Sequence, residues 1–302
     1  MANYLIAMAT FAAIYGLLAL SLNLIWGLTG MVNLGLAGFF AVGAYASALL
    51  TTSFALPIVL GLIVALIAAG LAGVALTLVT VRLRADYLAI VTLGFAEVVR
   101  LIALNETWLT RGADGISGIP GPFHEALGAH FNLGFLVLAL ALLGVTLVLV
   151  ERLRLSPFGR VLRAIRDDQQ VAAVAGKNVL AFKLKAFALS AALAGFAGAV
   201  YGHYTSYIVP DIFEPLITIY IFLALTAGGT GNNWGAVLGA FLVVAVLEST
   251  RFLSSWVPGL SGVQYAAMRE MLVGGLLIVV LMVRPHGLLP ERLPVPPTGR
   301  GG

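Results

Sequence analysis

Residues 57–81 read PIVLGLIVALIAAGLAGVALTLVTV, a run without a single charged side chain. A helix of about 20 such residues is long enough to cross the hydrocarbon core of a bilayer. The apolar character continues toward the N-terminus, because no charged residue occurs in residues 1–81. This part of the chain therefore predicts membrane-spanning helices.

The composition of the whole chain supports the same interpretation. Hydrophobic residues make up 61% of the 302 residues and charged residues 10%, and the mean hydropathy is +1.04. Soluble domains carry about 25% charged residues. The length accommodates about 8–10 spans and leaves no room for a separate soluble domain. We therefore expect an all-α polytopic membrane helix bundle, a single domain over residues 1–302.

Hydropathy divides the chain into nine expected spans. They lie near 4–26, 31–50, 57–81, 87–104, 132–150, 185–207, 216–228, 235–250 and 270–283. Glycines interrupt 31–50, and 216–228 is short, so both segments are candidates for irregular or re-entrant structure. Because a cleavable signal peptide needs a basic start, we expect residues 2–26 to be a retained span.

Basic residues set the expected orientation. The segment 151–185 holds eight of the 17 Lys and Arg residues and is expected to be cytoplasmic, with the turn at Arg82 and Arg84 and the tail after Arg284. The acidic loops 105–131 and 209–215 are then expected outside. Nine spans place the N-terminus outside and the C-terminus inside; a re-entrant segment would reverse the N-terminus.

The basic segment contains a predicted amphipathic helix from Ser156 to Ala175. Ser156 and Pro157 are typical of a helix start, and Gly176 of a helix end. Its apolar face comprises Phe158, Val161, Leu162, Ile165 and Ala172, and its polar face Arg160, Arg163, Arg166, Asp167 and Gln170. An interfacial helix in the lipid headgroups is one interpretation. Docking of a cytoplasmic partner is favoured, because it also accounts for the caps and the acidic residues.

Two charged residues fall inside an expected span. Glu97 and Arg100 lie three residues apart, hence on one helix face. Charges at that depth are expensive unless paired or hydrated. They either pair with each other to hold the bundle together or line a pathway, and the sequence favours neither.

Several classes of function are excluded by missing motifs. The chain lacks the G-x-x-x-x-G-K-[ST] phosphate loop, so it is not expected to bind ATP itself. It has no H-E-x-x-H motif, no nucleophile elbow and no cysteine. The basic residues follow the positive-inside pattern rather than a nucleic-acid-binding patch. We expect neither enzymatic activity nor a cofactor, metal or nucleic-acid partner.

Four segments resemble the LivM-type permeases of branched-chain amino acid ABC importers. Residues 86–100, DYLAIVTLGFAEVVR, resemble the signature segment of that family, and residues 33–38, NLGLAG, a segment of its second span. Residues 109–120, LTRGADGISGIP, resemble its outer loop, with Arg111 where glycine is usual. SPFGR at 156–160, continuing through Gly176 to AGFAG at 194–198, resembles its coupling loop, with Val171 where the importer motif has glutamate.

The resemblance, which covers about residues 20–290, implies partners and site residues. It implies a bacterial inner-membrane subunit that pairs with a second homologous permease and two ATP-binding cassette subunits, and receives substrate from a periplasmic binding protein. Coupling to the ATPase is assigned to Ser156, Phe158, Arg160, Arg163, Ile165, Asp168, Ala172 and Gly176. Asn33, Glu97 and Arg100 are candidate pathway residues, and Arg111, Asp114 and Gly115 belong to the loop expected to face the binding protein.

Two alternatives remain open from the sequence. Permeases of urea and short-chain amide importers have a very similar pattern and would change only the cargo. A proton-coupled secondary transporter would use Glu97 as its proton carrier, although few other acidic residues could assist it.

Overall fold

Each of the nine expected spans coincides with a helix. The computed structural model describes residues 2–80, 83, 85–256, 262–284 and 287–291. In these residues the long helices are α1 (Ala2–Leu22), α2 (Leu36–Ser53), α3 (Ile58–Thr80), α4 (Ala85–Asn105), α7 (Phe131–Leu155), α10 (Val179–Thr205), α11 (Pro215–Gly228), α12 (Asn233–Trp256) and α13 (Gly262–Val283). A π-helical turn, η1 (Asn23–Gly27), prolongs α1.

Six helices of the described residues are long and apolar enough to cross a membrane. They are Asn3–Gly27, Leu36–Ser53, Ile58–Thr80, Asp86–Asn105, Phe131–Leu155 and Val179–Thr205. Pro215–Gly228 and Asn233–Ser249 are shorter apolar helices. The protein is therefore a multi-pass membrane protein with the expected all-α bundle.

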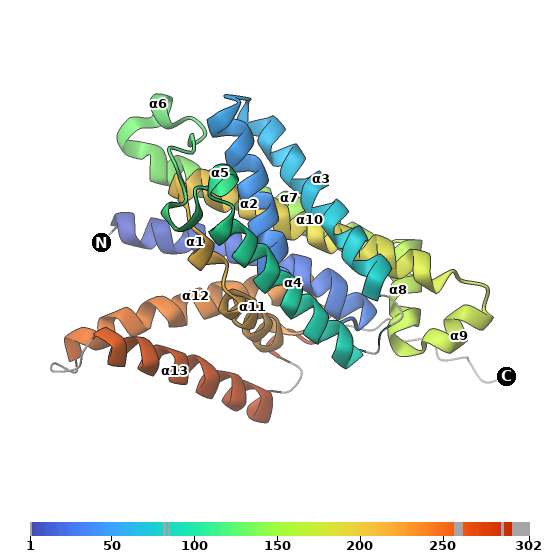
Figure 1. Cartoon of the computed structure of the whole chain (residues 1–302). Coiled ribbons are helices and arrows are strands. Elements are labelled where there is room, and N and C mark those ends of the chain that lie inside the picture. The colour runs from blue at the N-terminus through green and yellow to red at the C-terminus, as the bar shows by residue number, and fades with distance from the viewer. Residues whose placement is uncertain (1, 81–82, 84, 257–261, 285–286, 292–302) are drawn as a thin grey trace.

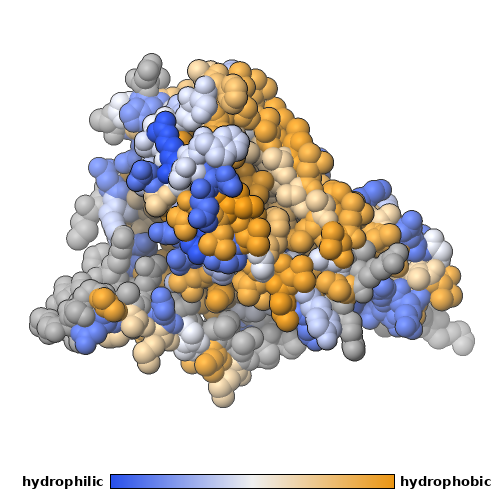
Figure 2. Space-filling model, viewed as in Figure 1, coloured by the Kyte–Doolittle hydropathy of each residue, from blue (hydrophilic) through white to orange (hydrophobic). Residues whose placement is uncertain are grey.

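The connecting segments gather at two opposite ends of the bundle (Figure 1). The first, which we call the basic end, carries α8 (Pro157–Asp167) and α9 (Gln169–Val174). The second, the loop end, carries α5 (Thr107–Thr110), η2 (Gly112–Asp114), β1 (Ile116–Ser117), α6 (His124–Leu127), η3 (Gly128–His130), β2 (Tyr207–Ile208) and η4 (Pro210–Phe213). Figure 2 shows a hydrophobic surface over α3 and α4 between these two ends.

A short antiparallel pairing joins the two loops that the sequence expected on one side. Ile116 of β1 pairs with Ile208 of β2, and Ser117 with Tyr207. The segments 105–131 and 209–215 therefore do lie at the same end of the bundle. Arg82, Arg84 and residues 292–302, which also entered the orientation argument, fall outside the described residues.

The second span differs from the expected 31–50, because its helix begins only at Leu36. The irregular backbone before it is satisfied by side chains: Asn33 Oδ1 accepts the N–H of Gly35 at 2.9 Å, and Thr92 Oγ1 accepts that of Leu34 at 3.0 Å. Thr218 Oγ1 likewise accepts the N–H of Ala37 at 3.1 Å. Non-helical backbone inside a membrane protein is stable where protein groups replace the lost helical hydrogen bonds.

Helix α10 packs against α1, α2 and α3 near the centre of the bundle. Gly195 of α10 allows this approach, since a Cβ there would collide with the Cβ of Ala69 on α3. Small residues at such crossings let helix backbones come close, which is how helices gain packing energy where lipid offers no hydrophobic drive.

Candidate functional site

The basic end is built on a helix pair whose start is fixed by the sequence. Ser156 Oγ accepts the N–H of Gly159 at 3.3 Å, and Pro157 occupies the first helical position of α8, as predicted. Phe158 stacks on Phe182 of α10 with ring centroids 5.4 Å apart. These contacts anchor the start of α8 to the bundle.

The single helix predicted from Ser156 to Ala175 is wrong, because the chain breaks at Asp168. Asp168 takes an extended conformation, and its carboxylate accepts the N–H groups of Gln170 at 2.7 Å and Val171 at 3.0 Å. Asp favours such caps because its side chain competes with the helical backbone bonds. Gly176 then ends α9 with φ +77°, where Lys177 N–H donates to the carbonyl of Ala172 at 3.2 Å.

A groove of about 530 Å³ opens between α8 and α9. Val161, Ala164 and Val171 contribute apolar walls, and Val171 is 64% exposed. Charged side chains also line it: Arg160, Asp167, Asp168 and Lys177. The structure thus presents an apolar groove with charges of both signs around it, on the outside of the basic end.

The predicted coupling residues are divided between this groove and the interior. Arg160 is exposed in the lining of the groove, and Arg163 is half-buried. Ile165 is 3% exposed and turned toward the bundle, so the expectation that it faces a partner is corrected. Ala172 is 3% exposed and contributes only to the inner wall of the groove.

The sequence argument missed Ala164 and Val171 as outward apolar residues. One continuous helix would have one apolar face, and these two residues fall off it. The cap at Asp168 turns α9 relative to α8, and the two helices then expose these side chains to one groove. The Asp-Gln-Gln sequence at 168–170 was the available signal, since Asp before a helix is a typical N-cap.

The second candidate is the charged pair on α4. Arg100 binds Glu97 through two contacts, Nη2 to Oε1 at 2.6 Å and Nε to Oε2 at 3.0 Å. Its Nη1 lies 3.5 Å from Oδ1 of Asp211 in η4. The side chains of Arg100 and Glu97 are 18% and 38% exposed. The two residues therefore bind each other, which is one of the two arrangements that the sequence left open, and the pair is partly exposed on the outside of this chain.

This partly exposed ion pair distinguishes the outward face of α4 from that of α3. Residues 58–80 of α3 contain no charge, its threonines Thr77 and Thr80 are buried, and its exposed large side chains are apolar. On α4, apolar residues such as Ile90 and Leu101 are exposed beside the charged pair. The face of α3 suits lipid, whereas a face with an ion pair is costly there.

Asn33 does not belong to this exposed face. Its side chain is fully buried, and Nδ2 has no hydrogen-bond partner among the described residues. Its oxygen closes the turn before α2 onto Gly35. Asn33 therefore shapes the irregular segment and is separate from the surface of Glu97 and Arg100.

At the loop end, Arg111 and Asp114 are exposed, whereas Gly115 is buried. Gly115 has φ +66°, and a Cβ there would collide with the carbonyl of Ile208, so this position needs glycine. Arg111 has φ +61°, in the left-handed region that glycine adopts more readily than any other residue.

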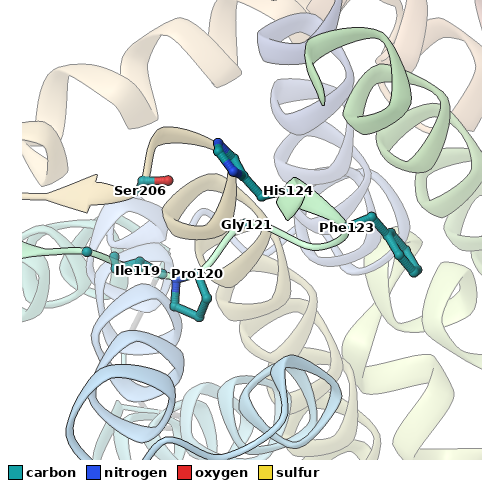
Figure 3. Close-up of a pocket in the computed structure, with 7 residues that line it drawn as sticks. Ile119, Pro120, Gly121, Phe123, His124 and Ser206 are labelled. Carbon is teal, nitrogen blue, oxygen red and sulfur yellow. The ribbon is translucent and has the colours of Figure 1, made fainter. Parts of the chain in front are cut away.

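A pocket of about 570 Å³ lies beside these residues. Figure 3 shows Ile119, Pro120 and Gly121 following one another along the loop, with Ser206 contributed by the segment after α10. His124 and Phe123 also line it. The sequence did not single out these residues, because the pocket forms only when two distant segments meet.

These features define the class of the protein. It is a multi-pass membrane protein that has an outward-facing groove between two short helices at one end and an ion pair on the outer side of one apolar helix. Residues 4–281 match the model of the family described as the permease component of branched-chain amino acid transport systems. The chain belongs to this family.

Curated relatives agree along nearly the whole chain. The high-affinity branched-chain amino acid transport permease LivM of Escherichia coli K12 is 34% identical, over 95% of this chain and 70% of that protein. A probable LivM of Methanocaldococcus jannaschii is 29% identical over 92% of this chain and 91% of its own. The high-affinity permease LivH of Salmonella typhimurium is 26% identical over 93% of this chain and 92% of that protein. No solved structure matches the chain.

Proposed function

We propose that this protein is the permease subunit of an ATP-driven importer for branched-chain amino acids. It forms the translocation pathway with a second homologous permease, two separate ATP-binding cassette subunits drive it, and a periplasmic binding protein delivers the substrate. It lies in a bacterial inner membrane, with the basic end and the C-terminus in the cytoplasm. Membership of the permease family supports this proposal.

The groove between α8 and α9 is the observation that best supports docking of an ATPase subunit on this protein. Val171 lies exposed in it between Asp168 and Lys177, so the surface suits a protein side chain that is apolar at its centre and polar around it. Interfaces commonly combine an apolar centre with a polar rim. A headgroup layer is a poorer match, because Asp167 and Asp168 are exposed beside the groove.

The α4 face carries the proposal for the pathway. Glu97 and Arg100 pair on the outside of this chain, where lipid would be an expensive neighbour. Contact with a second permease, or a water-filled pathway between two permeases, removes that cost. A LivH relative that matches 93% of this chain supports a homologous partner of similar fold.

The loop end is the proposed contact for the binding protein. Arg111 and Asp114 are exposed next to the pocket that Pro120 and Ser206 help to form. The pairing of β1 with β2 braces this surface, so it can receive a docked protein without first becoming ordered.

The alternatives make different predictions. A urea or short-chain amide importer would take up its cargo with the same architecture and is separated by competition with leucine. A proton-coupled transporter would act alone through Glu97, but Arg100 holds that carboxylate in two hydrogen bonds. Uptake by the isolated chain under a pH gradient, abolished by Glu97→Gln, would favour that alternative.

The test is purification of the tagged chain from its native membrane, followed by reconstitution with binding protein and ATP. We expect a second permease and ATPase subunits to co-purify, and leucine uptake to require ATP. Val171→Asp places a charge in the groove and should reduce ATPase recovery and uptake by about 10-fold, as for truncation of an interface hot spot.

Val174→Asp is the matched control, because Val174 is 91% exposed on the same helix but does not line the groove. It should have a clearly smaller effect. Unchanged assembly and uptake in Val171→Asp would contradict docking through the groove. Recovery of an intact chain alone would contradict the importer itself.

A further inference from the structure

Arg166 of α8 points away from the groove and reaches two other parts of the chain. Its Nη1 donates to the carbonyl of Gly27, the last residue of η1. The same nitrogen donates to Oε2 of Glu291 at 2.9 Å. The Arg166 side chain is 23% exposed and that of Glu291 14%. Arg166 Nε also lies 3.5 Å from Oδ1 of the neighbouring Asp167. Besides the packing of Phe158 on Phe182, one guanidinium thus ties α8 to two distant segments of the chain.

The segment that carries Glu291 is itself fastened to the end of α11. Leu288 N–H donates to the carbonyl of Ala227 at 2.9 Å, and Leu289 N–H to that of Gly228 at 2.8 Å. Ala227 and Gly228 are the last two residues of α11. Through Glu291, Arg166 is therefore connected to the end of a helix far from it in sequence.

The other acceptor lies in an equally connected place. Asn23, the first residue of η1, donates from Nδ2 to Oδ1 of Asn233 at 2.8 Å and accepts the N–H of Gly231 at 2.8 Å. Asn233 in turn donates to Oε2 of Glu151 at 2.7 Å. The π-helical turn thus joins α1 to the beginning of α12 and to α7. Such turns are rare and occur frequently at functional sites.

The carboxylate of Glu291 leaves room for a second arrangement of the Arg166 side chain. Its Oε1 is buried and has no hydrogen-bond partner among the described residues. A buried acceptor without a partner is costly. A guanidinium can bind both oxygens of a carboxylate at once, so a rotated Arg166 would satisfy Oε1 by releasing Gly27. A side chain that can exchange one set of hydrogen bonds for another can transmit a displacement between the elements it joins.

We propose that Arg166 and Glu291 form a clasp that transmits displacement of α8 to η1 and to the end of α11. The proposal rests on the proposed function, because an ATPase docked on the α8–α9 groove supplies the displacement. Arg166 is a positioning residue and contacts no substrate. Weakening the clasp should leave ATP hydrolysis running and lower the amount of substrate transported for each ATP.

The experiment reconstitutes the complete importer, with binding protein, and measures leucine uptake and ATP hydrolysis in the same vesicles. Glu291→Gln keeps the size of the side chain and removes its charge. We expect the ratio of uptake to hydrolysis to fall about 5-fold or more in this variant, the size of a modest coupling between sites. Arg166→Lys keeps the charge but cannot bind both oxygens, and we expect an intermediate ratio.

Arg152→Gln is the matched control, since Arg152 lies exposed at the end of α7 at the same end of the bundle and does not line the groove. It should leave the ratio of uptake to hydrolysis unchanged. A wild-type ratio in Glu291→Gln and Arg166→Lys, with full uptake, would overturn the clasp. Failure of the proposed function would appear differently, as an unmodified chain that neither assembles with an ATPase nor supports ATP-dependent uptake.

Discussion

Arg111 has a backbone conformation that glycine adopts more easily. Its φ of +61° lies in the left-handed region, where side chains other than glycine are strained. Arg111→Gly should therefore raise the free energy of unfolding by about 0.5–1 kcal/mol, the relief of strain being offset by the greater freedom of glycine in the unfolded chain. Thermal unfolding in detergent measures it. Arg111→Ala keeps the backbone strain, and an equal gain there would show that the side chain, not the backbone, is responsible.

Gly195 gives a second prediction at the residue scale. A Cβ at this position would collide with Ala69 of α3, whereas Gly144 of α7 has open space around it. Gly195→Ala should cost about 1–3 kcal/mol through overpacking, seen as a lower unfolding temperature. Gly144→Ala, the control, should be neutral or slightly stabilising because alanine favours the helix. Equal effects of the two substitutions would contradict close packing at Gly195.

At the scale of elements, Asp168 decides that the basic end has two helices. Asp168→Ala removes the cap on Gln170 and Val171 and should destabilise the start of α9 by about 1 kcal/mol. Hydrogen exchange of these two amides should accelerate about 5-fold. Asp168→Asn keeps a capping oxygen and should retain most of the protection. Unchanged exchange in Asp168→Ala would show that packing alone shapes α9.

The Asp168 cap also explains why the predicted apolar face identified the buried side chains but not the outward groove. Leu162 and Ile165 are buried at 0% and 3% exposure, as an amphipathic helix requires. The outward groove depends on the angle between α8 and α9, and a periodicity argument assumes one helix axis. Ala164 and Val171 were therefore not recognised.

At the scale of the whole molecule, the ion pair of Glu97 and Arg100 on α4 allows a test of the proposed contact with a second permease. Replacing only one member of the pair, as in Glu97→Leu or Arg100→Leu, leaves an uncompensated charge and should reduce assembly of the importer. Replacing both should restore assembly, because removing a whole ion pair costs less than breaking one. Co-purification with the second permease measures this.

Uptake by the assembled double variant then separates two roles of the pair. A loss of uptake supports pathway lining, and normal uptake supports a purely structural pair. If single and double variants assemble equally well, the pair does not lie in an interface or pathway that excludes lipid.

The sequence by itself determined the features that depend on composition and local chemistry. Long, mostly apolar runs favour helices in lipid, where the backbone has to satisfy its own hydrogen bonds. The nine long helices of the described residues therefore followed from hydropathy, and the caps at Ser156 and Gly176 from short-range hydrogen bonding. Helix geometry placed Glu97 and Arg100 on one face of α4 and left open whether they pair or line a pathway.

Tertiary structure decided what depends on distant segments. The delayed start of α2 rests on hydroxyl groups of Thr92 and Thr218, far along the chain from Leu34 and Ala37. The contact of Arg166 with Glu291 spans 125 residues. No periodicity encodes such meetings, because they arise from how helices pack across one another and from which buried polar groups then find partners.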